Sequence, residues 1–212
     1  MRKLATIRQI FDLQPIPEAD KIECATVDGW KVVVQKGKHV VGEKIIFFEI
    51  DSFLPEGDSR YDFLMKKGVR TMDGKRGHVL RTIRLRGQIS QGLLLPLHLF
   101  DGIAFQPDTD LSTILGIKKY DVPVPAQLAG RVKGSFPPFI RKTDQERAQN
   151  LIQEIFKDNI DSLFEITEKL DGTSCTIYHN NGQFGVCSRN LELDLEGNPN
   201  NAMVKVLNES GL

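Results

Sequence analysis

The sequence has 212 residues, and its 28 lysines and arginines balance its 28 aspartates and glutamates. A chain of this length suits one or two domains with a real core. Zero formal net charge predicts no strong non-specific attraction to nucleic acid, so binding would need a local basic patch.

The N-terminal segment MRKLATIRQI has no long apolar run, and no stretch approaches the length of a membrane span. The spacing of the three cysteines, Cys24, Cys175 and Cys187, matches no metal-binding motif. We expect them to be core thiols of a protein in a reducing compartment. Two of them, Cys175 and Cys187, fall in neighbouring predicted strands, which leaves a small allowance for an incidental disulfide. We therefore expect a cytoplasmic monomer with no membrane partner.

Residues 1–120 carry a series of short strand patterns separated by Pro, Gly and Asp turns. The candidates are LATIRQIFDLQ, ECATV, WKVVVQ, EKIIFFEI, HVLRTIRLRG and GLLLPL. The segment Val27–Trp30, VDGW, predicts a tight hairpin. Five or so short strands in this length predict a small barrel, for which the oligonucleotide-binding (OB) fold is the natural candidate. Trp30 could stack on a base, whereas Phe47 and Phe48 are predicted barrel core.

The densest basic stretch of this region runs from Lys75 to Arg86. On a strand, Arg84 and Arg86 would share one face and Leu85 would point to the other. Two interpretations stay open. The stretch could line a groove that follows the phosphates of a single strand, or it could be a solvated strand face whose charges block edge pairing.

From Asp121 to Pro138 the sequence becomes rich in proline and turn residues, which predicts an interdomain connector. A helix is predicted next over DQERAQNLIQEIF, with Thr143 or Asp144 as its N-cap. Its inward-facing side would be formed by Ala148, Leu151 and Ile155.

The segment Phe164–Ser174, FEITEKLDGTS, predicts a strand that runs into a turn at Lys169–Gly172 and leaves as a second strand, SCTIY. Gly172 permits a backbone geometry that other residues resist, and the small hydroxyl side chains of Thr173 and Ser174 leave room for a ligand.

Asn180-Asn181-Gly182 before QFGVCSR is a hairpin signal. If Asn181–Gly182 is the two-residue loop, Ser174 comes opposite Arg189; a shift of one residue would put Gly172 there. Either register brings Arg189 beside the lysine turn, and two converging cations suit a phosphate-bearing ligand. The alternative is an ordinary hairpin with exposed basic residues.

The string EKLDGTSCTIY, followed by FGVCSRNLEL, resembles the first two motifs of the fifth family of ATP-dependent RNA ligases, which carry an OB module ahead of the catalytic domain. The resemblance implies that Lys169 attacks the α-phosphorus of ATP to give a covalent lysyl-AMP. AMP would then pass to an RNA 5′-phosphate, and an RNA 3′-hydroxyl would displace it. The implied nucleotide-binding residues are Glu168, Leu170, Gly172 and Arg189.

Other segments extend the resemblance. The N-terminal region resembles the OB-type tRNA-binding modules of some synthetases and the N-terminal module of the same ligase family. The resemblance lies in four segments and their order: PIPEADKI, GEK, LP and IRLRGQISQG. FIRKTDQERAQN, residues 139–150, resembles the family's entry into the catalytic domain. The implied RNA or phosphate contacts are Arg147, Ser188, Asn190, Arg84 and Arg86. For Arg147, a solvent-facing helix arginine is the alternative.

The implied cofactors are ATP and a divalent metal ion, Mg²⁺ or Mn²⁺, with the metal ligands left unassigned. A free lysine is protonated at neutral pH, so the pKa of Lys169 would have to be lowered by partial burial and by a neighbouring cation. Glu168 and Asp171 would bind metal through water or act as hydrogen-bonded turn residues. An acid of the N-terminal module, Glu49 or Asp51, could hold a metal-bound water, and the choice stays open.

We expect a β-rich α+β protein with an OB module over 1–120, a linker over 121–138, and the N-terminal part of an adenylyltransferase domain over 139–212. Because the family's later motifs do not occur before Leu212, the sequence predicts a C-terminally incomplete RNA ligase acting on RNA with 3′-hydroxyl and 5′-phosphate ends. A non-catalytic RNA-binding OB-fold protein is the main alternative. A nucleotidyltransferase for DNA ends or caps fits less well, since those enzymes usually carry the OB module after the catalytic domain.

Overall fold

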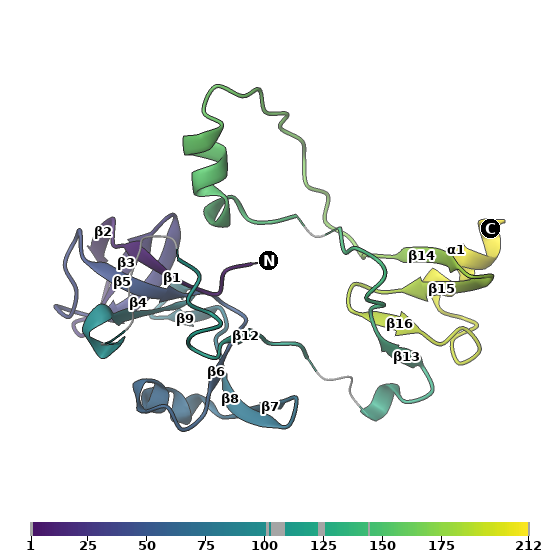
Figure 1. The fold of residues 1–212 in the computed structure, drawn as a ribbon, viewed down its shortest axis with the longest axis horizontal. Helices are drawn as coiled ribbons and strands as arrows, with labels where there is room; N and C mark the ends of the chain where they lie inside the picture. The colour runs from purple at the N-terminus through teal and green to yellow at the C-terminus, as the bar shows by residue number, and fades with distance from the viewer. Residues whose placement is uncertain (1, 101, 103–108, 123–125, 144, 212) are drawn as a thin grey trace. The chain divides into compact units, whose positions relative to one another are not determined.

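The computed structural model describes residues 2–100, 102, 109–122, 126–143 and 145–211. Two units make up the chain: the first comprises residues 1–122 and 147–160, and the second comprises residues 123–146 and 161–212. Each unit is described by itself below (Figure 1). Among the described residues, no helix has the length and apolar composition needed to cross a membrane.

The first unit is built almost entirely from short antiparallel strands. They are β1 (Ala5–Gln9), β2 (Asp12–Pro15), β3 (Ile22–Val27), β4 (Trp30–Gln35), β5 (Lys44–Phe48), β6 (Ser52–Pro55), β7 (Arg70–Met72), β8 (Lys75–Val79), β9 (Ile83–Leu85), β10 (Gln88–Ser90), β11 (Leu93–Pro96) and β12 (Lys118–Lys119). They pair in the orders β2-β3-β4, β1-β5-β11, β12-β6-β8-β7 and β10-β9. Its helical turns are η1 (Ser59–Lys67), η2 (Leu97–Phe100), η4 (Ala148–Asn150) and η5 (Gln153–Asp158). The predicted all-β N-terminal region is confirmed.

The hairpin predicted at Val27–Trp30 is present between β3 and β4. Val27 pairs with Trp30, and the two loop residues, Asp28 and Gly29, have positive φ angles of 45° and 79°. A two-residue hairpin loop favours this geometry because its twist matches that of the flanking strands. The Asp-Gly sequence therefore decides this turn locally.

Strand β5 is buried on both faces. Because side chains alternate along a strand, Ile45 and Phe47 join one apolar cluster while Ile46 and Phe48 join the other. The predicted core positions of both Phe residues are confirmed. Trp30 is only 2% exposed and packs against Phe47 at 6.0 Å between ring centroids, so the suggestion that it stacks on a base is wrong for this structure.

The shared strand face predicted for Arg84 and Arg86 is wrong. Strand β9 ends at Leu85, and β10 begins at Gln88. Arg86 and Gly87 have φ angles of 50° and 78° and form the two-residue turn between the strands. Arg86 therefore points from a turn, and only Arg84 belongs to the strand.

The second unit is a four-stranded antiparallel sheet, in the order β13-β16-β15-β14, with one helix. Its elements are η3 (Ala126–Leu128), β13 (Val132–Ser135), β14 (Thr176–Asn180), β15 (Gln183–Cys187), β16 (Leu191–Leu193) and α1 (Ala202–Glu209). The side chain of Asn201 caps α1 by accepting a hydrogen bond from the Met203 amide at 2.9 Å. Val204 and Leu207 of this helix pack against Val186 and Leu193 of the sheet.

Part of the predicted connector is not a linker in its local structure. Val132–Ser135 forms β13, an edge strand whose backbone pairs with β16. Its half-buried Val132 packs against the apolar cluster of the second unit. The proline-rich composition of this segment predicted a linker. Its partner strand lies about sixty positions later in the chain, and a local sequence pattern carries no signal for a pairing at that separation.

The strand predicted before Lys169 is absent: residues 163–175 are described and have no regular secondary structure or turn. Leu163 is 103% exposed, Ile166 95% and Leu170 82%. Alternating apolar residues stabilise a strand only when a partner strand and a buried face are available, and the unit supplies neither here.

The single helix predicted from Thr143 or Asp144 is also wrong. Its region forms the short η4 and η5, and η4 begins after Arg147 without a side-chain cap. Asp144 lies outside the described residues. Leu151 and Ile155 are only half-buried, and a short helix needs a well-packed apolar face to form stably.

All three cysteines are free, so the alternative of a disulfide between Cys175 and Cys187 is wrong for this structure. Cys24 and Cys187 are buried core thiols as predicted, but Cys175 is exposed. Burial, followed by the negative charge of Glu192, raises the pKa of Cys187 to about 11. A thiol with that pKa stays protonated at neutral pH and is a poor nucleophile.

Candidate functional site

The candidate site lies at one end of the β14–β15 hairpin in the second unit. The two-residue loop is Asn181–Gly182, with φ angles of 48° and 77°, as predicted. The ladder ends with Thr176 opposite Cys187. The chain that enters β14 carries Lys169, and the chain that leaves β15 carries Arg189, so local hairpin chemistry places both at the same end.

Both cations line one hollow with a volume of about 470 Å³, named the lysine hollow here. Its lining residues are Thr143, Gln145, Thr167, Glu168, Lys169, Leu170, Ser174 and Arg189. The structure therefore brings together four of the predicted nucleotide-site residues: Lys169, Glu168, Leu170 and Arg189. Ser174 and Arg189 share the hollow, as expected from the register that places them opposite each other.

Gly172 does not behave as predicted. It is absent from the lining of the lysine hollow, its φ is not among the positive values, and a Cβ atom added there would meet nothing within 4 Å. A side chain at this position would therefore fit both the backbone and the space around it. In this conformation the protein does not use the backbone freedom of a glycine at position 172.

The lysine hollow has the chemistry of a phosphate site. It presents one ammonium group, one guanidinium group, the hydroxyls of Thr143, Thr167 and Ser174, and a single carboxylate, that of Glu168. Guanidinium groups bind phosphate oxygens through two parallel hydrogen bonds, while an ammonium group acts as a compact charge. Lys169 is exposed, so the partial burial that the sequence predicted is not present. The donor set fits the triphosphate of a nucleotide.

Thr143 and Gln145 are lining residues that sequence reasoning did not assign to the site. They precede Lys169 by more than twenty residues, and no spacing rule connects them to it. The segment FIRKTDQERAQN, which resembles the family's entry into the catalytic domain, contains both residues. This resemblance is the sequence signal that points to them, although it implied a contact only for Arg147. In the described residues, no group of three or more His, Cys, Asp or Glu side chains is arranged to hold a metal ion.

Ser188 and Asn190 lie beyond the lining of the lysine hollow and take part in the turn after β15. The Ser188 amide donates to the Leu191 carbonyl at 2.9 Å, and the Leu191 amide donates to Ser188 Oγ at 3.3 Å. Lys142 Nζ donates to Asn190 Oδ1 at 3.1 Å. These bonds hold the loop that carries Arg189.

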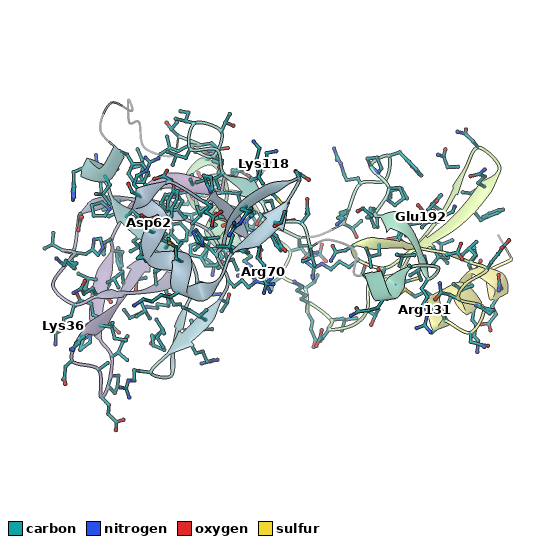
Figure 2. The ribbon with its side chains drawn as sticks, turned by 90° about the horizontal axis from the view of Figure 1, so that it is seen from below. Lys36, Asp62, Arg70, Lys118, Arg131 and Glu192 are labelled. Atoms are coloured by element: carbon teal, nitrogen blue, oxygen red, sulfur yellow. The ribbon has the colours of Figure 1, made fainter. Side chains whose placement is uncertain are left out.

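A polar cluster locks the hairpin behind this loop. Tyr178 donates its hydroxyl proton to Glu192 Oε1 at 2.7 Å, and Lys133 Nζ lies 3.2 Å from the same oxygen. Burial and then the hydrogen bond to Glu192 raise the pKa of Tyr178 to about 12, so its hydroxyl remains a donor at neutral pH. Its ring covers Gly185 on the paired strand, where an added Cβ would lie 2.2 Å from the ring. Figure 2 labels Glu192 in this unit.

The two acids of the N-terminal module are engaged by Arg2, which sequence reasoning did not single out. Arg2 Nε lies 2.5 Å from Glu49 Oε2, and Arg2 Nη1 lies 3.3 Å from Asp51 Oδ2. Glu49 is buried at 4% exposure. In this structure, a buried carboxylate is therefore neutralised by an arginine rather than presented to solvent.

Arg147 belongs to the first unit, where it packs on Trp30. Its guanidinium carbon lies 5.2 Å from the centroid of the Trp30 ring, within the range of a cation–π interaction. The neighbouring Gln149 is close enough that a Cβ on Gly29 would lie 3.3 Å from its Cγ. The segment that begins at Arg147 therefore packs on the β3–β4 hairpin.

Trp30 is the chain's only tryptophan, so its fluorescence reports on this contact. Arg147→Ala is expected to shift the emission maximum of Trp30 to longer wavelength by a few nanometres, because the guanidinium no longer covers the indole face. Arg141→Ala removes an exposed arginine six residues earlier in the chain, which belongs to the second unit, and should leave the spectrum unchanged. Identical spectra for wild type and Arg147→Ala would show that the stacking does not persist in solution.

Arg84 and Arg86 also belong to the first unit. Arg84 donates from Nη1 to the Gly87 carbonyl at 3.2 Å and lines a hollow of about 500 Å³. His78 and Arg81, which belong to the basic stretch from Lys75 to Arg86, line the same hollow, as does Arg70, which lies outside that stretch. Arg86 is not part of the lining.

Comparisons with known proteins support both regions. A family model for an OB-fold domain matches residues 4–97, and a family model for RNA ligase matches residues 162–209. The comparison with curated proteins gave no match.

Solved structures of one protein cover nearly all of the chain. An RNA ligase of Naegleria gruberi with PPi is 45% identical, with a TM-score of 0.68 and coverage of 100% of this chain and 64% of that chain. A variant of that ligase with AMP and Mn is 45% identical, with a TM-score of 0.70 and coverage of 99% and 64%. A variant with ATP and Mn is 44% identical, with a TM-score of 0.67 and the same coverage. The chain thus spans about two thirds of the length of these relatives.

Proposed function

We propose that this chain is part of an RNA ligase with an N-terminal OB-fold module, and that it supplies the lysine nucleophile and the phosphate cradle of this ATP-dependent enzyme. The observation that carries the proposal is the lysine hollow. It places Lys169 and Arg189 together, within the residues matched by the RNA ligase model. Structures of the N. gruberi ligase contain ATP, AMP and Mn, which supports ATP and a divalent metal ion as the cofactors.

In the first step, Lys169 Nζ gives up a proton to solvent and bonds to the α-phosphorus of ATP. The bond from that phosphorus to the oxygen shared with the β-phosphorus breaks, and pyrophosphate leaves. Arg189 neutralises charge on the phosphates, since nucleotidyl transfer depends mainly on positioning and electrostatic stabilisation. Glu168 and Leu170 position the nucleotide, and we retain Gly172 as a position of close approach in the nucleotide-bound state. A bound divalent metal ion, Mg²⁺ or Mn²⁺, would add positive charge at the phosphates.

In the second step, an oxygen of an RNA 5′-phosphate attacks the AMP phosphorus and releases the Lys169 amine. In the third step, an RNA 3′-hydroxyl attacks the activated 5′-phosphorus, and AMP leaves. The RNA contacts that we propose are Arg84, Arg86, Arg147, Ser188 and Asn190. The proposed organisation is an OB module over 1–120, a linker over 121–138 and an adenylyltransferase region over 139–212, acting as a monomer.

The proposal is tested with α-labelled ATP and either Mg²⁺ or Mn²⁺. Two proteins are compared: the 212-residue chain, and a chimera in which it replaces the corresponding part of the N. gruberi ligase. We expect covalent label in the chimera, removed by acid, as is typical of a phosphoramidate, and reversed by added pyrophosphate. Label in the 212-residue chain as well would show that it completes the first step alone. Absence of label from both proteins would contradict the proposal and favour RNA binding without ATP chemistry.

A further inference from the structure

Three arginines from different strands and loops of the first unit converge on one hollow. Arg70 begins β7, Arg84 lies in the middle of β9, and Arg81 lies between β8 and β9. All three are exposed and line the hollow of about 500 Å³, named the arginine hollow here. The four-stranded sheet that contains β7 and β8 brings Arg70 to this position, although it lies outside the basic stretch visible in the sequence.

In the described residues, the charges of these arginines are not neutralised by ion pairs. Over the described part of the chain, no acidic side chain pairs with Arg70, Arg81 or Arg84: Arg81 lies 6.0 Å from the Tyr120 ring, and Arg84 donates to a backbone carbonyl. Other arginines of this unit do have acidic partners, namely Arg2 with Glu49, Arg8 with Asp28, Arg60 with Asp58 and Arg76 with Glu56. In a chain with zero net charge, this local excess of positive charge is complementary to an anionic ligand.

Apart from His78, the other side chains that line the arginine hollow are apolar. Buried Leu64 and Leu80 form its floor, and the half-buried Ile83 and the 38% exposed Leu85 supply its accessible apolar surface. A free phosphate would use the guanidinium groups and leave this apolar surface uncovered. A nucleotide unit uses both, since its phosphate is anionic and the face of its base is apolar.

We propose that the arginine hollow binds a segment of single-stranded RNA, with backbone phosphates on Arg70, Arg81 and Arg84 and an unstacked base against Ile83 and Leu85. OB folds bind single strands through a positively charged groove combined with surfaces that contact bases. The assignment of RNA rests on the proposed ligase function. It adds Arg70 and Arg81 to the RNA-contact residues and gives Arg84 a defined binding surface.

The test measures binding of a fluorescently labelled single-stranded RNA of about 20 nucleotides by anisotropy, without ATP, over a range of salt concentrations. Arg70→Ala/Arg81→Ala is expected to weaken binding roughly tenfold at low salt. It should also reduce the magnitude of the slope of log K against log salt by about 1.4, or about 0.7 for each lost phosphate contact. The control, Lys36→Ala/Lys38→Ala, removes the same charge from exposed positions of the same unit (Figure 2 labels Lys36 and Arg70).

Equal weakening by the two double variants would overturn the inference, because it would show a diffuse charge effect. An unchanged salt slope for Arg70→Ala/Arg81→Ala would overturn it too. If the alanine variant does not fold, Arg70→Lys/Arg81→Lys keeps the charge but loses the two-contact geometry, and it is expected to bind RNA more weakly than wild type. Since binding is measured without ATP, covalent labelling by the chimera reports on the proposed function separately.

Discussion

Lys169→Ala is expected to abolish covalent labelling from α-labelled ATP in the chimera, a loss of at least about 10³-fold. The substitution removes Nζ, the atom that would bond to the α-phosphorus, and no other described lysine lines the lysine hollow. Because Lys169 is exposed, its replacement should change the free energy of unfolding by less than about 0.5 kcal/mol. Loss of labelling would then reflect chemistry rather than folding.

Two further variants make this test specific. Lys169→Arg keeps a positive charge in the hollow but lacks a nucleophile, so it should bind ATP and still fail to form the covalent product. Lys205→Ala removes an exposed lysine from α1 in the same unit and should label like wild type. Labelling retained by Lys169→Ala would show that another residue is the nucleophile.

Gly92→Ala is expected to destabilise the first unit by about 3 kcal/mol. The φ angle of Gly92 is +133°, a backbone conformation that residues with a side chain rarely adopt. An added Cβ would lie 2.5 Å from Cε2 of Phe47 and 2.7 Å from the Phe48 carbonyl oxygen. Both neighbours belong to the buried strand β5, so the methyl group would have to displace the core strand itself.

The matched control is Gly87→Ala, in the turn between β9 and β10. Gly87 also has a positive φ, +78°, but an added Cβ would meet nothing within 4 Å. We expect it to cost about 1 kcal/mol, the penalty of the left-handed conformation alone. Urea unfolding followed by Trp30 fluorescence measures both variants, since Trp30 lies in the core of this unit. Equal losses for the two variants would contradict the steric argument.

The sequence alone predicted the features that depend on neighbouring residues. Asp28–Gly29 and Asn181–Gly182 are two-residue loops in the structure because their residue types favour positive φ wherever they occur in a chain. The prediction that the two large aromatic residues Phe47 and Phe48 belong to the barrel core is confirmed. The motif around Lys169 and the hairpin register together predicted that Lys169 and Arg189 share a site, and both line the lysine hollow.

Tertiary structure decided where residues distant in the sequence meet. Thr143 lines the lysine hollow although it lies more than twenty residues before Lys169, and Arg70, Arg81 and Arg84 converge on the arginine hollow from separate elements. Packing also buried Trp30, while the strand pattern before Lys169 found no partner and stayed irregular. Turns are selected by the backbone preferences of a few adjacent residues. Burial and convergence of charge depend instead on contacts across the whole unit, so only the folded chain determines them.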